Sequence, residues 1–328
     1  MRGSPWPDFT AGPGTAPGGV FSCPGCRGQS AAITGSLGLV EALDPERELI
    51  ERALGRPVAA TARAAWGFTN RTDMVTLADG QRAVVQRYRH REDASYRLRV
   101  MQGLSEPAIE AGIPLPQVRE FSLDDDPPWA IYDVLPGVPV PEAGELRPGG
   151  PRFTHAARMM GELLASFRGL PAADLRLDDL WADPRRLAAA AARWAEQLPV
   201  SAGRVLDAVL GLFAGRPVVL THGDFAPVNI LTDGTTVTGL LDFEAVRLAD
   251  PLFDPAWWAW SVSFSGPGVL ETAWPPFLAG AGIDPAESRP GECVHALQVL
   301  RMMEQLANGN LAPGIAGIVT DRLHGALT

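Results

Sequence analysis

The chain contains no lysine, and all 28 of its Lys-or-Arg positions are arginine. It has three cysteines among 328 residues. That small, odd number argues against a disulfide framework and favours a reducing compartment. No run of 18 apolar residues is present, so we expect no transmembrane helix. The N-terminal stretch lacks the continuous apolar core of a secretory signal. These absences together predict a cytoplasmic protein.

Acidic residues outnumber basic ones: 38 acidic residues and 28 arginines give a formal net charge of −10. Such a balance makes nucleic acid an unexpected partner. An acidic surface favours a cationic small molecule as substrate. The hydrophobic content of 46% and the charged content of 20% are ordinary for a soluble globular protein. The length is sufficient for two lobes with substantial cores.

Residues 1–35 are rich in glycine, proline and serine, and we predict that they form a disordered tail. Two of the three cysteines, Cys23 and Cys26, lie in this tail. Their spacing is compatible with half of a zinc site or with a redox pair. No second ligand pair follows at zinc-finger spacing and no strand precedes them, so we interpret the pair as incidental.

The chemistry is concentrated between residues 218 and 244. A short apolar run at 218–220 predicts a buried strand. Farther along, two apolar segments flank Asp233-Gly234, a pattern typical of a β-hairpin. Asn229 stands at the start of this hairpin and Asp242 at its end. Because hairpin ends lie side by side, we expect both side chains to converge near Asp224.

Two carboxylates and an amide oxygen in one place suit a hard cation such as Mg²⁺. Phosphoryl transfer from a nucleotide needs such a set. One aspartate accepts the proton of the attacking hydroxyl, while an asparagine and a second aspartate hold Mg²⁺ on the phosphates. We assign the first role to Asp224 and the metal-binding role to Asn229 and Asp242. ATP and Mg²⁺ are therefore the expected cofactors.

Protein kinases carry these residues as H-R-D-x₄-N followed by D-F-G. This chain has His222-Gly-Asp224, four further residues, Asn229, and then Asp242-Phe-Glu. The variant resembles the aminoglycoside phosphotransferase family, small-molecule kinases with the protein-kinase-like fold. The resemblance implies a bilobal α+β fold. Its small β-rich N-lobe would span 36–137 with a hinge near 132–137, and its larger, mostly helical C-lobe would span 138–328.

The same resemblance implies roles for residues outside the motif. Gly67 and Asn70 would lie over the nucleotide phosphates, at the start of a hairpin that covers the nucleotide. Backbone groups from Asp133 to Leu135 would pair with the adenine edge. His222 would act as a structural hydrogen-bonding residue that fixes the catalytic loop. Farther on, Asp254 would brace that loop from behind, and we also expect it to cap a helix beginning at Pro255.

The N-lobe departs from the family pattern. Members carry a basic residue on the strand after the covering hairpin turn, paired with a glutamate on the next helix. Here the strand offers Gln86 or Arg87, and alternation lets only one of them face the cleft. We predict that Arg87 does so through a one-residue bulge, because a phosphate requires a cation. On the helix, Glu92 is available, but Arg97 occupies the place expected for the acid.

The sequence thus predicts an ATP-dependent O-phosphotransferase acting on a small-molecule hydroxyl, such as that of an aminoglycoside, another antibiotic or a natural product. A kinase-like, nucleotide-binding regulatory protein without turnover is the alternative, motivated by Gln86 and the missing lysine. A metal-dependent hydrolase built on His222 is disfavoured, since no other histidine is spaced as its ligand partner. We interpret Trp257, Trp258 and Trp260 as core residues, with an aromatic that stacks on the substrate as the alternative. Five glutamates are both candidates for binding amino groups of the substrate and ordinary surface residues: Glu244, Glu271, Glu287, Glu292 and Glu304.

Overall fold

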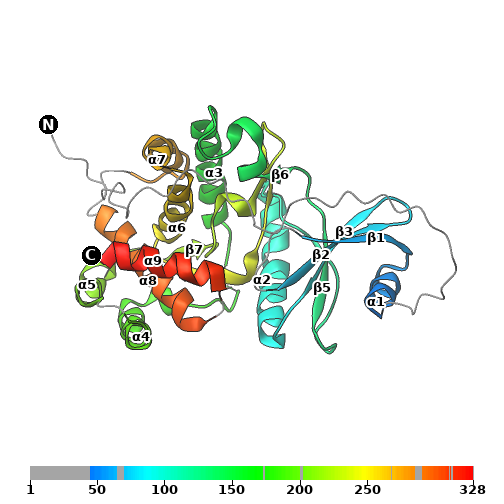
Figure 1. Cartoon of the computed structure of the whole chain (residues 1–328), viewed down its shortest axis with the longest axis horizontal. Coiled ribbons are helices and arrows are strands. Elements are labelled where there is room, and N and C mark those ends of the chain that lie inside the picture. Colours follow the sequence, from blue (N-terminus) through cyan, green and yellow to red (C-terminus); the bar gives the residue numbers. More distant parts are fainter. Residues whose placement is uncertain are drawn as a thin grey trace.

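The computed structural model describes residues 45–64, 70–172, 174–199, 202–266, 268–284, 290–309, 311 and 313–327. The predicted tail 1–35 lies outside these residues, as does Gly67. The described chain forms a small lobe built on a β-sheet and a larger helical lobe (Figure 1). The predicted bilobal α+β fold is confirmed.

The small lobe is a five-stranded antiparallel sheet with strand order β1-β2-β3-β5-β4. Helix α1 lies at the outer end of the lobe, and helix α2 stands between the sheet and the helical lobe (Figure 1). The elements are α1 Pro45–Leu54, β1 Val58–Arg63, β2 Arg71–Leu77, β3 Arg82–Arg87, α2 Arg91–Glu110, β4 Val118–Ser122 and β5 Trp129–Asp133.

The two faces of this sheet pack into different cores. Ala83 and Val85 of β3 join a cluster that includes Ile50 of α1. Val84 and Tyr88 instead pack into the main core, which extends through α2 into the helical lobe. Because side chains alternate along a strand, each residue of β3 is thereby assigned to the α1 face or to the α2 face.

The helical lobe encloses two small sheets, of order β6-β8-β9 and β10-β7. The predicted hairpin is present as β8 and β9, joined through Asp233-Gly234. The helices are α3 Phe153–Arg168, α4 Pro184–Gln197, α5 Gly203–Phe213, α6 Phe253–Val262, α7 Val269–Gly280, α8 Pro290–Asn308 and α9 Pro313–Leu327. The strands are β6 Val138–Pro139, β7 Val219–Thr221, β8 Ile230–Thr232, β9 Val237–Leu240 and β10 Arg247–Ala249.

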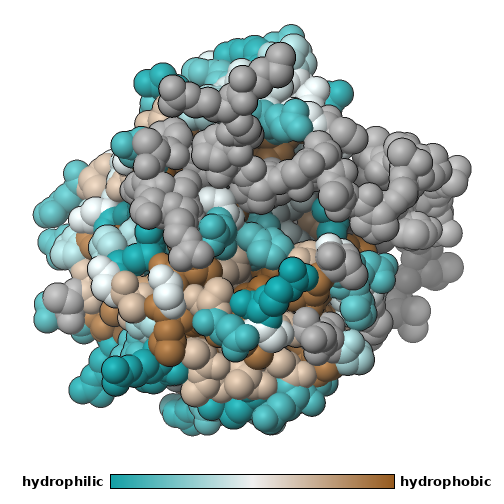
Figure 2. Space-filling model, turned by 90° about the vertical axis from the view of Figure 1, so that its left-hand side faces the viewer, coloured by the Kyte–Doolittle hydropathy of each residue, from teal (hydrophilic) through white to brown (hydrophobic). Residues whose placement is uncertain are grey.

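Figure 2 looks onto the end of the helical lobe, where hydrophobic residues lie exposed between hydrophilic ones. In the part of the chain that the structure describes, no helix has the length and apolar character needed to span a bilayer.

Helices α3 and α7 pack closely because glycines line their contact. A Cβ added to Gly161 of α3 would lie 2.1 Å from the carbonyl oxygen of Phe277, and one added to Gly280 of α7 would lie 2.3 Å from that of Arg158. Both neighbours are backbone atoms of a packed helix, so neither can move without shifting the helix itself. Glycine at these two places sets how near the helices approach.

We therefore expect Gly161→Ala to lower the free energy of unfolding by about 1–3 kcal/mol, the usual cost of overpacking. Gly211→Ala in α5 is the matched control, since an added Cβ meets nothing within 4 Å there. It should stabilise the protein by about 0.5–1 kcal/mol through higher helix propensity. Urea denaturation of both variants measures the difference, and equal stability would contradict the close packing of α3 on α7.

Candidate active site

The loop between β7 and β8 carries Asp224 and Asn229. The side-chain amide of Asn229 donates to Asp224 Oδ2 at 2.8 Å and to the Asp224 carbonyl oxygen at 2.9 Å. Its nitrogen is thus committed to Asp224, which leaves Asn229 Oδ1 without a hydrogen bond among the described residues. The structure brings this pair together as the sequence predicts.

Asp242 follows β9 and faces the same loop. The N–H of Leu241, its neighbour, donates to the Asn229 carbonyl oxygen at 2.8 Å. Asp242 adopts a left-handed backbone conformation with φ 69° and ψ 72°, a conformation that costs energy for a residue with a side chain. Burial raises the pKa of Asp242, the Arg97 guanidinium opposes this, and the nearby Asp224 carboxylate raises it further. The two carboxylates are therefore close enough to influence one another.

His222 is fully buried and neutral. Its Nε2 donates to the Leu241 carbonyl oxygen at 2.9 Å, while Nδ1 accepts the N–H of Asp224 at 3.3 Å. Burial lowers its pKa, although Asp254 and Asp224 pull in the opposite direction. Three phenylalanine rings pack around the imidazole: Phe167, Phe225 and Phe243. A neutral ring with both nitrogens in use links the loop between β7 and β8 to the end of the hairpin.

Asp254 holds the same loop from the opposite side. Its two carboxylate oxygens accept the backbone N–H groups of His222 at 2.8 Å and Gly223 at 2.9 Å. The expectation that Asp254 caps a helix beginning at Pro255 is wrong. Helix α6 begins at Phe253, and both carboxylate oxygens are used by the loop. Gly223 has φ +83°, and a Cβ there would lie 1.9 Å from the Ala245 carbonyl oxygen, so the loop requires glycine.

Trp257 has a role that sequence reasoning missed. Its indole Nε1 donates to Asp224 Oδ1 at 2.6 Å, while Asn229 holds Oδ2. Asp224 is therefore fixed through both carboxylate oxygens. Trp257 is buried, as the core interpretation predicts. The available signal was spacing, since residues three apart on a helix share a face and Asp254 already touches the loop.

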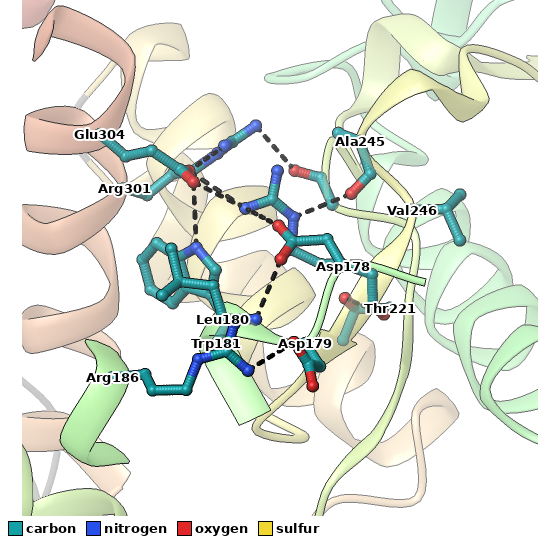
Figure 3. Close-up of polar contacts among 12 residues, drawn as sticks. Asp178, Asp179, Leu180, Trp181, Arg186, Thr221, Ala245, Val246, Arg301 and Glu304 are labelled. Carbon is teal, nitrogen blue, oxygen red and sulfur yellow. Dashed lines mark hydrogen bonds and ion pairs between the residues drawn. The ribbon is translucent and has the colours of Figure 1, made fainter. Parts of the chain in front are cut away.

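A buried group of charges lies behind the loop. Glu304 of α8 accepts from Arg247 at 2.9 Å and from the Trp181 indole at 3.1 Å, and it pairs with Arg301. Figure 3 shows Glu304, Arg301 and Trp181 pointing toward one another. Arg301 also donates to the Gly223 carbonyl oxygen at 3.3 Å. This group ties α8 to the backbone of the loop that carries Asp224.

These contacts correct both sequence interpretations of Glu304. Only 6% of the residue is exposed, so it is neither a surface glutamate nor free to bind an amino group of a substrate. Burial raises the pKa of Glu304, but Arg247 and Arg301 more than offset this and lower the pKa to about 2.

The prediction that Arg87 faces the cleft is wrong. Pairing of β3 with β2 and with β5 runs without interruption to Arg87, so the proposed bulge is absent from this strand. Arg87 shares the α1 face with Val85, donates to Asp73 at 3.0 Å and lies 3.7 Å from Glu46. Uninterrupted alternation instead places Gln86 on the α2 face, where it accepts a hydrogen bond from the hydroxyl of Tyr88 at 3.2 Å.

The other residues predicted to contact the nucleotide differ in their surroundings and in the groups that they leave available. Asn70 is buried at the start of β2 and donates to Glu244 at 3.0 Å. The N–H of Asp133 already donates to the Gln117 carbonyl oxygen at 2.9 Å, so that group is not available to an adenine. Leu135 lies in the segment that joins the two lobes. Glu92 is exposed on α2.

The candidate site is strongly acidic. Burial, together with the charge of Asp242, raises the pKa of Glu244 to about 7 although Arg97 opposes the shift. Asp242 Oδ1 is bonded to Arg97, while Oδ2 makes no hydrogen bond within the described part of the chain. Asp242 Oδ2 and Asn229 Oδ1 are thus two unused hard oxygens beside excess negative charge. That donor set fits a magnesium ion.

The sequence of this chain matches the model of a known enzyme family. Residues 61–290, more than half of the chain, match the phosphotransferase enzyme family, and the chain belongs to this family. A curated relative, an aminoglycoside 3'-phosphotransferase of Streptomyces fradiae, is 35% identical over 151 residues. That match covers 42% of this chain and 55% of the relative, so it spans about half of the relative's length.

Solved structures show the same fold at low sequence identity. A macrolide 2'-phosphotransferase of Brachybacterium faecium is 20% identical with a TM-score of 0.62, over 87% of this chain and 98% of that one. An aminoglycoside phosphotransferase in complex with ADP and hygromycin B is 15% identical with a TM-score of 0.63, over 86% and 97% of the two chains.

We expect Glu304→Gln to destabilise the protein by about 3–5 kcal/mol at neutral pH, because two buried arginines lose their shared partner. The folded-state pKa of Glu304 lies near 2, below its usual value of 4.5. Its contribution is therefore complete above pH 4.5 and is lost as the pH falls toward 2.

Over that acidic range the wild type should lose more stability than Glu304→Gln, so the two stability curves should converge. Chemical denaturation between pH 2 and pH 7 measures this. Glu271→Gln, at an exposed position of α7, is the control and should follow the wild type throughout. Parallel curves for wild type and Glu304→Gln would contradict the buried ion pairs.

Proposed function

We propose that this protein is an ATP-dependent phosphotransferase that acts on a hydroxyl group of a small molecule. One observation carries the proposal. The carboxylate of Asp224 is held through both oxygens by Trp257 and Asn229, beside the unused oxygens of Asn229 and Asp242. A fixed base adjacent to a magnesium-binding pair is the arrangement that phosphoryl transfer uses.

Each residue of the site has a defined task in this mechanism. Asp224 orients the acceptor hydroxyl and accepts its proton as the phosphoryl group is transferred. Asn229 and Asp242 would hold Mg²⁺, which when bound neutralises charge on the nucleotide phosphates. His222 stays neutral and keeps the loop in place, and therefore does not compete as a base. Catalysis by such a site is positioning and electrostatics rather than covalent chemistry.

The proposed acceptor is a hydroxyl-bearing antibiotic or related natural product. Relatives of this chain are named as phosphotransferases of aminoglycosides and macrolides. The net charge of −10 favours a cationic acceptor such as an aminoglycoside. We place the reaction in the cytoplasm, where ATP is available, and we propose Leu135, in the connection between the lobes, as a backbone contact to the adenine.

The direct test is a panel of aminoglycoside, macrolide and sugar hydroxyl acceptors with ATP or GTP and Mg²⁺. Mass spectrometry should find an acceptor that gains one phosphoryl group. Nucleotide binding without a phosphorylated product from any acceptor would instead favour the regulatory alternative, for which the neutral Gln86 on the α2 face is the supporting observation.

Replacing Asp224 by alanine should lower kcat by about 10²–10⁴-fold, the usual contribution of a general base. The affinity for nucleotide should stay near that of the wild type, because the metal ligands remain. Steady-state kinetics and calorimetric titration with ADP measure the two quantities. Asp207→Ala on the exposed face of α5 is the matched control. A fall in kcat of less than about tenfold would remove Asp224 from the role of base.

Asp242→Asn should weaken binding of the magnesium–nucleotide complex as well as lower kcat, because a neutral amide no longer offsets the charge of the metal. The requirement for Mg²⁺ should shift to higher concentration, which a Mg²⁺ titration of nucleotide affinity measures. Binding of adenosine, which has no phosphates for a metal to bridge, should be unchanged. If the Mg²⁺ requirement of the variant equals that of the wild type, Asp242 is not a metal ligand.

A further inference from the structure

In the family pattern a basic residue on the strand pairs with an acidic residue on the next helix, and this chain departs from the pattern at both positions. The strand residue on the α2 face is the neutral Gln86, and the helix position expected for an acid holds Arg97. Arg97 is only 8% exposed. Its Nη1 donates to Asp242 Oδ1 at 3.0 Å and lies 3.6 Å from Glu244 Oε2. A buried arginine of the small lobe thus reaches the proposed metal ligand of the helical lobe.

We propose that Arg97 supplies the positive charge that binds the nucleotide phosphates, so that this charge comes from helix α2 instead of strand β3. The inference rests on the proposed function, since it assigns a residue to the nucleotide of that reaction. It gives Gln86 a neutral supporting role, and it removes the need for a lysine that the chain does not contain.

Two hydrogen-bonded tyrosines, Tyr132 and Tyr88, lie beside the guanidinium of Arg97. Arg97 lies over the ring of Tyr132, 5.8 Å from its centroid. The hydroxyls of Tyr132 and Tyr88 are 2.5 Å apart, and Tyr88 donates in turn to Gln86 Oε1. Gln86 is therefore hydrogen-bonded to this tyrosine pair beside Arg97. The side chain that would have carried the strand cation now helps to fix the surface against which Arg97 packs.

The charges of Arg97 and of the proposed Mg²⁺ together suit a nucleotide polyphosphate. Asp242 is paired with Arg97 and is also the proposed ligand of Mg²⁺, so the metal and the guanidinium would stand near one another with like charge. Phosphates between them would attract both. The Nε–H of Arg97 is buried and has no hydrogen-bond acceptor among the described residues. Phosphate oxygens suit a guanidinium, which presents several donors in one plane.

Other nearby arginines do not meet this requirement. Arg87 is paired with Asp73 on the opposite face of the sheet. Arg91 pairs with the exposed Asp124, and Arg99 is exposed and donates to the Arg176 carbonyl oxygen. Along this strand and helix, as far as the structure describes them, Arg97 is the arginine in contact with the proposed metal ligands.

The test compares the affinities for ATP with Mg²⁺ and for adenosine, measured by calorimetry. Arg97→Gln should weaken ATP binding by about 10- to 100-fold, the worth of charge-assisted hydrogen bonds. Adenosine affinity should change by less than about twofold, because adenosine carries no phosphate. Arg97→Lys, which keeps the charge but not the planar fork, should show a smaller loss of ATP affinity. Arg99→Gln, two residues along the same helix, is the control and should bind both ligands as the wild type does.

A reversal variant separates charge from structure. Arg97→Glu alone should abolish the preference for ATP over adenosine. Combining it with Gln86→Lys restores a strand cation and a helix acid, and should recover that preference at least in part. A merely structural role for Arg97 predicts no such recovery, because the added lysine would not repair packing.

The outcomes distinguish this inference from the proposed function. If the wild type binds no nucleotide, or phosphorylates no acceptor, the proposed function fails. If the wild type is active but the ratio of ATP to adenosine affinity is unchanged in whichever of Arg97→Gln and Arg97→Lys folds, the assignment of Arg97 is overturned. Equal weakening of both ligands, together with a lower Tm, also overturns it.

Discussion

The site depends on one buried carboxylate that binds two consecutive backbone amides. Asp254 is fully buried and accepts the N–H groups of His222 and Gly223. Burial raises the pKa of Asp254, and His222 and the two amides oppose this. Two amides that would otherwise lie buried without partners are satisfied in this way. The same helix then carries Trp257 to Asp224, so α6 sets both the backbone of the loop and the orientation of its aspartate.

Two buried arginine contacts converge on this loop and the hairpin beside it. From the helical lobe, Arg301 reaches the Gly223 carbonyl oxygen and is itself neutralised by Glu304. From the small lobe, Arg97 reaches Asp242. Arg301 shares the carboxylate of Glu304 with Arg247 and is buried, which suits a structural brace. Arg97 instead lies against Asp242 and Glu244 at the candidate site, which suits a group that meets a ligand. Buried arginines thus serve two purposes, according to the groups that surround them.

Sequence reasoning found the site where chemistry requires fixed residue types at fixed spacing. The hairpin and the convergence of its ends on the loop were predicted correctly, since Asp224 and Asn229 are in contact and Asp242 follows β9. It failed where the decisive fact was the direction of a side chain. Arg87 was favoured because phosphates need a cation, yet uninterrupted strand pairing turns it toward α1. Trp257 was assigned to the core. It is buried, but that assignment did not predict the hydrogen bond from its indole N–H to Asp224.

What the sequence by itself determined is therefore the local frame: a strand, a glycine-bearing loop, a hairpin, and the oxygen-bearing side chains at its two ends. These follow from contacts between residues close in the chain, whose geometry short-range rules describe. Only the tertiary structure decided which cation joins them, that Glu304 is enclosed by Arg247 and Arg301, and that Arg97 lies beside Asp242 across 145 positions of chain. Such pairings depend on how helices and sheet faces pack together, and the periodicity of a single segment carries no information about its distant neighbour.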